Sequence, residues 1–327
     1  NGDNKLMATY STIKGFNIQS YASDPAAPGV AGATWASGAT INTARQDVAA
    51  FGNPVATTAV IAGGTTGLLT EEYDGTSWAA VNTLTGSATN SAGSAGTVTA
   101  GVYFGGSFGP PGNTNITQKY DGTSWTTSGL MNTARRSMAS GGTQTAAFAA
   151  LGADVPTFVT AAETYDGSTW TSINSCLTAR RSGGGSGTVT AALAFGGYTI
   201  PGAIADQTET YNGTSWSETN DLNTGRTSVA GSHSGTNAAA LCMGGDTPPA
   251  TAKTEYFDGT SWTEVADLSR ARVAGGSGTS TDAFIAGGSP EPSPATYSSE
   301  SEFFSTGTSI AQEGQVWYNT TSTVLKG

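Results

Sequence analysis

The sequence predicts an all-β protein built as a six-bladed β-propeller with four-stranded blades. The first observation is a hexapeptide, Tyr-Asp-Gly-Thr-Ser-Trp, that begins at Tyr73, returns unchanged at Tyr120 and returns in variant forms three more times. Its tryptophans stand at positions 78, 125, 170, 216 and 262, which gives a period of about 46 residues. The second observation is a small-residue segment that ends in Gly-Gly within each period. A period of this length, filled with short strands, is typical of propellers and solenoids.

The hexapeptide predicts a strand, a tight turn and a second strand. Asp-Gly and Asn-Gly accept the positive φ that a twist-matched hairpin turn requires. The tyrosine then ends one strand, and the tryptophan opens the next. We interpret these aromatic residues as packing between adjacent repeats, and a row of ligand-stacking rings is the alternative.

Each repeat also carries an arginine before its Gly-Gly segment. Arg45 has counterparts at Arg135, Arg180, Arg226 and Arg272, and the second repeat breaks the pattern with Ala88 at the expected position. Paired glycines at a strand end favour positive φ or close backbone approach. We count six such segments, although the third, Leu151-Gly152, lacks one glycine. Four strands in each unit of this length predict a propeller blade.

The two ends of the repeat region complement each other. Trp35 lies in a strand without a hairpin partner, and the last hairpin, residues 302–310, has no tryptophan. We therefore expect the strand around Trp35 to complete the sixth blade and close the ring. This gives an N-terminal arm (1–30), a propeller (31–310) and a C-terminal β-hairpin tail (311–327), with hairpin strands at 316–318 and 323–325. Within the arm, residues 12–19 are expected to form a short strand.

Composition excludes several classes of partner. The 327 residues include 13 Lys and Arg against 24 Asp and Glu, a formal net charge of −11. Phosphate contacts need clustered basic residues, so we expect no nucleic-acid partner and no anionic membrane partner. No transmembrane stretch or signal peptide is evident.

The sequence contains few residues suited to metal binding or redox chemistry. Cys176 and Cys242 occupy non-equivalent positions and are interpreted as small buried residues, with a disulfide as the alternative. The chain has one histidine, His233, and no zinc-binding pattern. We expect no metal and no cofactor.

Two resemblances follow from these motifs. The order Arg, Gly-Gly, Tyr-Asp and Trp over residues 35–310 resembles the kelch repeat of β-propellers, which implies the fold but not a function. The segment 313–327, Glu-Gly-Gln-Val-Trp-Tyr-Asn-Thr-Thr-Ser-Thr-Val-Leu-Lys-Gly, resembles a segment of virion proteins of tailed bacteriophages, particularly marine ones. There it often follows a Ser-Asp-Pro stretch, which in this chain stands at Ser23, near the opposite end. This resemblance implies a protein of the virion surface or the extracellular space.

Enzyme chemistry is disfavoured. Glycoside hydrolysis needs two placed carboxylates, whereas Asp74, Asp121, Asp166 and Asp258 are explained by turn formation. A Ser-His-Asp triad would have to use His233. Copper-radical oxidases resemble this fold, but they need several histidines, and no phosphate-binding loop, CxxC or HExxH motif occurs. We expect no enzymatic activity and assign no catalytic residue.

Binding is favoured by variation between repeats. The hexapeptide turns are nearly constant, whereas the loops between Gly-Gly and tyrosine differ in length and carry aromatic, Asn and Asp residues. In an up-and-down blade these loops share one face, here called the loop face, with the segments that carry the arginines. Such residues on adaptable loops suit a polar ligand such as a glycan. The candidate ligand-binding residues are Arg135, Arg180, Arg226, Phe108, Asn113, Phe158, Tyr198, Asp206 and Tyr297.

Each candidate has a plainer alternative. The loops can be surface segments that tolerate sequence variation without binding a ligand. The arginines can bond to carbonyls or acidic neighbours near the propeller axis. Three functions remain: a non-enzymatic structural protein of the virion surface (tail fibre, tail or capsid decoration) with a loop face for host attachment, a carbohydrate-binding adhesin module, and a polysaccharide-active enzyme. We rank the structural protein first, with other virion proteins as partners through residues 1–30 and 311–327, and with cell-surface glycans as a further partner class.

Overall fold

The computed structural model describes residues 19–21, 32–53, 57–86, 89–108, 112–290, 297–306, 317–319 and 324–326. Within these ranges all regular structure is β-strand, as the small-residue and turn-rich sequence predicts. No helix in the described ranges is long and apolar enough to cross a membrane. The chain forms two compact units, one of residues 34–305 and one of the two ends, residues 1–33 with 306–327.

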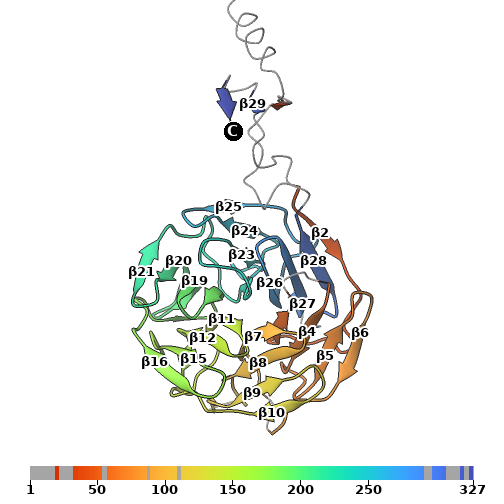
Figure 1. The fold of residues 1–327 in the computed structure, drawn as a ribbon, viewed down its shortest axis with the longest axis vertical. Helices are drawn as coiled ribbons and strands as arrows, with labels where there is room; N and C mark the ends of the chain where they lie inside the picture. The colour runs from red at the N-terminus through yellow and green to blue at the C-terminus, as the bar shows by residue number, and fades with distance from the viewer. Residues whose placement is uncertain are drawn as a thin grey trace, which may run out of the picture. The chain divides into compact units, whose positions relative to one another are not determined.

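Residues 34–305 form six antiparallel four-stranded blades around a central axis, which confirms the predicted fold class (Figure 1). The first three blades are β3 (Ala49–Gly52), β4 (Ala59–Ala62), β5 (Thr70–Tyr73) and β6 (Trp78–Val81); β7 (Gly93–Thr97), β8 (Ala100–Phe104), β9 (Thr117–Tyr120) and β10 (Trp125–Thr127); and β11 (Ala139–Thr143), β12 (Ala146–Ala150), β15 (Ala162–Tyr165) and β16 (Trp170–Ile173). The fourth and fifth are β18 (Gly184–Thr188), β19 (Ala191–Thr199), β20 (Ala203–Tyr211) and β21 (Trp216–Thr219), with β17 (Arg180–Arg181) added beside β19; and β22 (Ala230–Gly231), β23 (Ala240–Met243), β24 (Thr254–Phe257) and β25 (Trp262–Glu264).

The sixth blade closes the ring in the predicted way. It consists of β26 (Arg272–Gly278), β27 (Asp282–Pro290), β28 (Ser301–Ser305) and, from the start of the unit, β2 (Thr34–Ser37). Trp35 stands opposite Phe304 in the β2–β28 pair, with ring centroids 5.2 Å apart. Inner strands β3, β7, β11, β18, β22 and β26 lie against one another in a closed circle. The ring therefore depends on a strand pair whose members lie at opposite ends of the unit.

The two ends of the chain share a separate three-stranded sheet. Its strands are β1 (Gln19–Tyr21), β29 (Trp317–Asn319) and β30 (Val324–Lys326). β29 and β30 form the predicted C-terminal hairpin one residue later than expected, and β1 pairs with β29 in parallel. The N-terminal arm and the C-terminal tail are thus one unit rather than two. Residues 12–18 of the expected N-terminal strand lie outside the described residues.

The hexapeptide forms the expected turn. In its first copy Asp74 Oδ1 accepts hydrogen bonds from the backbone amides of Thr76 and Ser77, both at 2.8 Å, and Gly75 has φ 99°. The same two bonds recur at Asp121, Asp166, Asn212 and Asp258. These side chains serve as turn acceptors, in agreement with the turn interpretation of the repeated aspartates.

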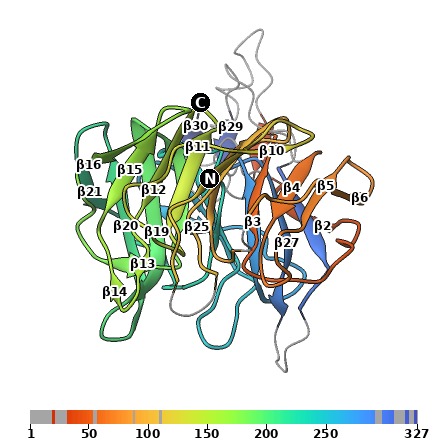
Figure 2. The same cartoon turned by 90° about the horizontal axis from the view of Figure 1, so that it is seen from below.

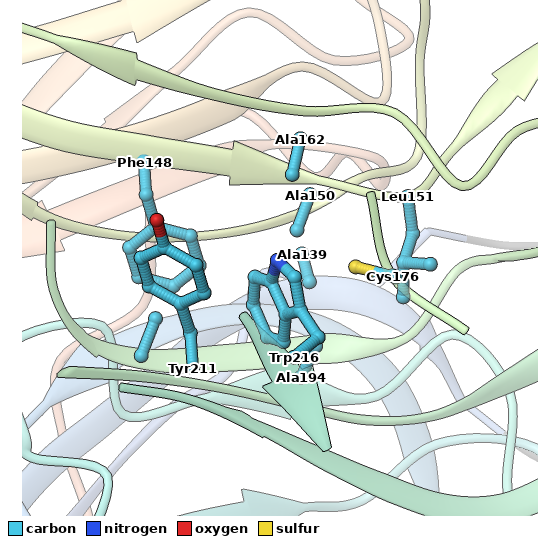
Figure 3. Close-up of a cluster of buried hydrophobic side chains, with 10 residues drawn as sticks. Ala139, Phe148, Ala150, Leu151, Ala162, Cys176, Ala194, Tyr211 and Trp216 are labelled. Atoms are coloured by element: carbon cyan, nitrogen blue, oxygen red, sulfur yellow. The ribbon is translucent and has the colours of Figure 1, made fainter. Parts of the chain in front are cut away.

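The hexapeptide aromatics pack between blades, which supports the core interpretation over a ligand-stacking row. Trp125, Trp170 and Trp262 are nearly fully buried. Each indole Nε1 donates to a threonine Oγ1 of the preceding blade, at 2.9 to 3.1 Å. Figure 3 shows the corresponding cluster between blades 3 and 4, where Trp216 packs beside Ala162. Alanine replaces the threonine there, and the buried Trp216 Nε1 has no partner within the described residues.

Ala162→Ser is expected to raise the free energy of unfolding by about 1 kcal/mol, because a serine hydroxyl would give the buried Trp216 N–H its missing acceptor. Thr117→Ala is the matched control, since it removes the acceptor of Trp170 and is expected to lower stability by about 1–3 kcal/mol. Urea unfolding followed by tryptophan fluorescence measures both changes. An Ala162→Ser variant less stable than the natural chain would contradict this role of the indole N–H.

Candidate functional site

Arg135, Arg180 and Arg226 lie in the core rather than on the loop face. Each has 0% exposure. Arg135 and Arg180 form short ion pairs with Glu163 and Glu209, and Arg226 Nη2 lies 2.7 Å from Glu255 Oε1. Arg45 and Arg272 form the same pair with Glu71 and Glu302. The structure therefore favours the plainer interpretation of these arginines, in which their buried guanidinium groups bond to acidic neighbours.

Each glutamate also holds the segment that leads into the inner strand. Glu163 accepts hydrogen bonds from the backbone amides of Asn132 and Thr133, at 2.7 and 3.2 Å. Arg135 Nη2 donates to the carbonyl of Ala149 at 3.1 Å. The ion pair thus ties the inter-blade connection to strands β12 and β15, and it fixes the base of the loop face.

The second blade replaces this ion pair by neutral groups. The position equivalent to arginine is Thr89 and not Ala88, because Ser91 has the left-handed conformation found two residues after Arg45, Arg135, Arg180 and Arg226. One inserted residue explains the shift in the sequence. Thr89 forms a short hydrogen bond with the Tyr103 hydroxyl, and Gln118 stands where the other blades have glutamate, with its Oε1 2.8 Å from the amide of Thr85. In blade 2 both the arginine and the glutamate of the ion pair are therefore replaced, so neither Thr89 nor Gln118 buries an unpaired charge.

Backbone hydrogen bonds link the first five blades to one another around the central channel. Asp47, Ser91, Ser137, Ser182 and Ser228 all have φ between 53° and 59°. From Ser91 onward each amide donates to the carbonyl of its counterpart in the preceding blade, at 2.7 to 3.0 Å. Left-handed φ is uncommon for residues other than glycine, and here the bonds between blades hold it. Burial raises the pKa of Asp47, although the charge of Arg136 acts in the opposite direction.

The central channel is a cavity of about 120 Å³ lined by residues of all six blades. His233 lines it as well, and its Nδ1 lies 3.2 Å from the carbonyl oxygen of Ala50 in the first blade. Burial lowers the pKa of His233 to about 4, so the imidazole is neutral at pH 7. Within the described ranges no group of three or more His, Cys, Asp or Glu side chains is arranged to hold a metal. Cys176 and Cys242 are both buried and free, so they form no disulfide.

Two of the predicted residues, Phe158 and Tyr198, meet on the loop face. Phe158 belongs to the small hairpin β13 (Ala153–Asp154) and β14 (Thr157–Phe158), which Figure 2 shows at the lower edge of the blades. Tyr198 belongs to β19 of the next blade, and the two ring centroids are 6.3 Å apart. The Arg181 guanidinium carbon lies 5.1 Å from the Phe158 centroid and 6.0 Å from the Tyr198 centroid. We call Phe158, Arg181 and Tyr198 the arginine–aromatic cluster.

The other predicted residues lie outside this cluster. Phe108 and Tyr297 are 50% and 41% exposed. Asn113 is half-buried and donates from Nδ2 to the carbonyl of Ala153 at 2.9 Å, so it supports the base of the β13–β14 hairpin. Asp206 is half-buried, and its carbonyl accepts the amide of Leu222 at 3.0 Å.

Arg181 lies in a segment predicted on the loop face but was not among the candidate ligand-binding residues, although the sequence contains a signal for it. Arg135-Arg136 and Arg180-Arg181 are adjacent pairs, and neighbouring residues of an extended segment point to opposite sides. One arginine of each pair fills the core position, so the other must lie outside it. The buried glutamates had a signal too, because a glutamate stands two residues before the first aromatic residue of the hexapeptide in four of the five copies, at Glu71, Glu163, Glu209 and Glu255.

The described residues thus define a closed six-bladed β-propeller. Among solved structures, YjhT is a similar propeller, with a TM-score of 0.67 and 12% sequence identity, and the match covers 82% of this chain and 97% of that protein. At this identity the likeness shows the fold alone. Comparisons with protein-family models and with curated protein sequences give no match.

Proposed function

We propose that the protein is a non-enzymatic structural protein of the virion surface of a tailed bacteriophage, docked through its chain ends and presenting the loop face for host attachment. The observation that carries this proposal is the terminal sheet β1–β29–β30. The propeller closes through β2 and β28 without using residues 1–33 or 306–327, so both ends are free to build a second unit. The phage-like segment 313–327 overlaps β29 and β30.

The terminal sheet suits docking because two of its strands are edges. β29 is central, and β1 and β30 each have one unpaired side within the described sheet. Edge strands offer backbone N–H and C=O groups to a strand of another chain. Other virion proteins are the proposed partners of these edges. We also propose that the blades are of the kelch class, on the order of Arg, Gly-Gly, Tyr-Asp and Trp in the repeats.

The full chain is expected to assemble in solution, whereas a chain shortened to residues 32–306 is expected to be a folded monomer. The shortened chain keeps β2 and β28 and therefore keeps ring closure. Light scattering after size-exclusion chromatography gives both masses, and far-UV circular dichroism confirms folding. If both the full chain and the shortened chain are monomers, docking through the ends alone is not supported. If both chains assemble, the contact between copies lies on the propeller rather than on the ends.

Carbohydrate binding by the loop face is a second candidate function, and the arginine–aromatic cluster favours it. Aromatic rings and an arginine on neighbouring loops are groups that bind polar ring-shaped ligands. An enzymatic role is not proposed, because Asp74 and its counterparts are used as turn acceptors.

A further inference from the structure

We propose that the ligand of the loop face is an acidic saccharide whose carboxylate is bound by Arg181. This inference rests on the second candidate function, carbohydrate binding, and specifies its ligand. It is independent of docking through the chain ends.

Arg181 differs from its neighbour Arg180 in how its donors are used. Arg180 donates from Nε to the carbonyl of Gly196 at 3.0 Å, from Nη2 to that of Ala194 at 3.1 Å, and from Nη1 to Glu209. The Arg181 side chain makes no hydrogen bond and no ion pair within the described part of the chain, and its Nε is buried without a partner there. The terminal Nη1 and Nη2 also make no hydrogen bond there but are not buried, so an incoming anion can reach them and form charge-assisted hydrogen bonds.

The guanidinium is already held in place before any ligand arrives. Arg181 pairs with Tyr198 in the β17–β19 ladder, and Phe158 pairs with Ala153 in the β13–β14 hairpin. The rings approach the guanidinium from two different blades. Aromatic contact leaves the edge of the planar guanidinium available for in-plane hydrogen bonds. Binding therefore needs little ordering of the arginine, which lowers the entropic cost of association.

Charge favours an anion at this point of an otherwise acidic protein. Arg136 occupies the equivalent position of blade 3 and also lacks an ion pair within the described residues, since its Nη1 bonds to Ser107 Oγ at 3.0 Å. By contrast, Arg270 on blade 6 pairs with Glu300. Asp154, on the β13–β14 hairpin, is exposed and forms no ion pair with Arg181 in the described structure. Arg181 thus has no carboxylate partner among the described residues, whereas the charge of Arg136 acts on the Asp47 carboxyl.

A carboxylate is the anion that best fits this geometry. Its two oxygens accept two parallel N–H bonds from one guanidinium, a match that a neutral hydroxyl cannot provide. The half-buried rings of Phe158 and Tyr198 supply apolar surface beside the charge, which suits the C–H face of a sugar ring. A uronic acid combines both features in one residue.

Titration calorimetry with trigalacturonic acid, a glucuronate-containing trisaccharide and their carboxyl-reduced neutral counterparts tests the proposal on the full chain. At least one acidic trisaccharide is expected to bind, at least tenfold more tightly than its reduced form. Arg181→Gln is expected to weaken that binding about 10- to 100-fold, the equivalent of a hydrogen bond to a charged group. Arg181→Lys should retain part of the affinity, because lysine keeps the positive charge but cannot donate two parallel hydrogen bonds to a carboxylate.

Arg270→Gln is the matched control, since it removes an exposed arginine of the inter-blade segment leading into blade 6 and is expected to leave affinity unchanged. Thermal unfolding of Arg181→Gln should match that of the natural chain, which separates lost binding from lost folding. Equal binding of acidic and reduced forms, or full affinity in Arg181→Gln, overturns the inference and leaves carbohydrate binding standing. Absence of binding to every saccharide overturns both, while docking through the ends is decided by its own mass measurement.

Discussion

Glu163→Gln is expected to lower the free energy of unfolding by about 3–5 kcal/mol, the usual cost of removing one partner of a buried ion pair. The substitution leaves the Arg135 guanidinium, which has 0% exposure, without its counter-charge. It also places an amide where a carboxylate accepts the backbone N–H groups of Asn132 and Thr133. Equilibrium unfolding in urea measures the change.

The neutral groups of blade 2 suggest a second variant of blade 3 that should compensate for the loss of the Glu163 carboxylate. A triple substitution, Arg135→Thr, Ala149→Tyr and Glu163→Gln, gives blade 3 the neutral groups that Thr89, Tyr103 and Gln118 form in blade 2. The tyrosine ring fills the volume that the arginine vacates. This variant is expected to recover at least half of the stability lost in Glu163→Gln, although it removes more native atoms.

The exposed ion pair between Lys253 and Glu264 is the control for charge removal in general. Both side chains are solvated, so Glu264→Gln is expected to change stability by less than about 1 kcal/mol. A loss as small as this in Glu163→Gln would show that the buried pairs do not hold the blades together. If the triple variant is less stable than Glu163→Gln, the neutral groups of blade 2 cannot replace the ion pair of blade 3.

The fold was predictable because its information is local and repeated. Each hairpin is encoded by a few adjacent residues, and Asp74 with Gly75 is sufficient for its turn. Ring closure was predictable from two incomplete repeats. The sequence around Trp35 has no hairpin partner strand beside it, and the last hairpin of the repeat region has no tryptophan. The shared terminal sheet was not predictable in this way, because Gln19 and Trp317 are far apart in sequence and no local pattern joins them.

The candidate site was harder to predict, since exposure depends on tertiary packing. Arg135 and Arg136 are chemically identical, and only the pairing of Arg135 with Glu163 on another strand places one in the core and leaves the other on the loop face. Phe158 and Tyr198 were predicted on the loop face individually. Their meeting depends on the paths of the β13–β14 hairpin and of the extended strands β19 and β20, which loop composition does not determine.

His233 is expected to make the fold sensitive to mild acid. The folded protein holds its pKa at about 4, below the value of about 6.5 for an unfolded chain, because the half-buried ring lines the central channel and is largely desolvated there. As pH falls, the unfolded chain therefore takes up a proton before the folded one does. The stability is fully present above about pH 6.5 and is lost progressively between about pH 6.5 and pH 4. A difference of about 2.5 pKa units corresponds to a loss of up to about 3 kcal/mol.

The single histidine allows this loss to be assigned. Imidazole proton signals in NMR give the folded pKa directly, and urea unfolding between about pH 7.5 and pH 4 gives the stability profile. His233→Asn keeps an N–H donor for the carbonyl of Ala50 and cannot titrate, so it is expected to remove most of the slope over this acid range. Asp47, in the same channel, has a pKa raised above its usual value of 3.8, so the folded chain takes up this proton before the unfolded one as pH falls towards 3.8, and its contribution has the opposite sign within the same acid range. Because both chains contain Asp47, the difference between their profiles isolates the histidine, and identical profiles would place the acid sensitivity elsewhere.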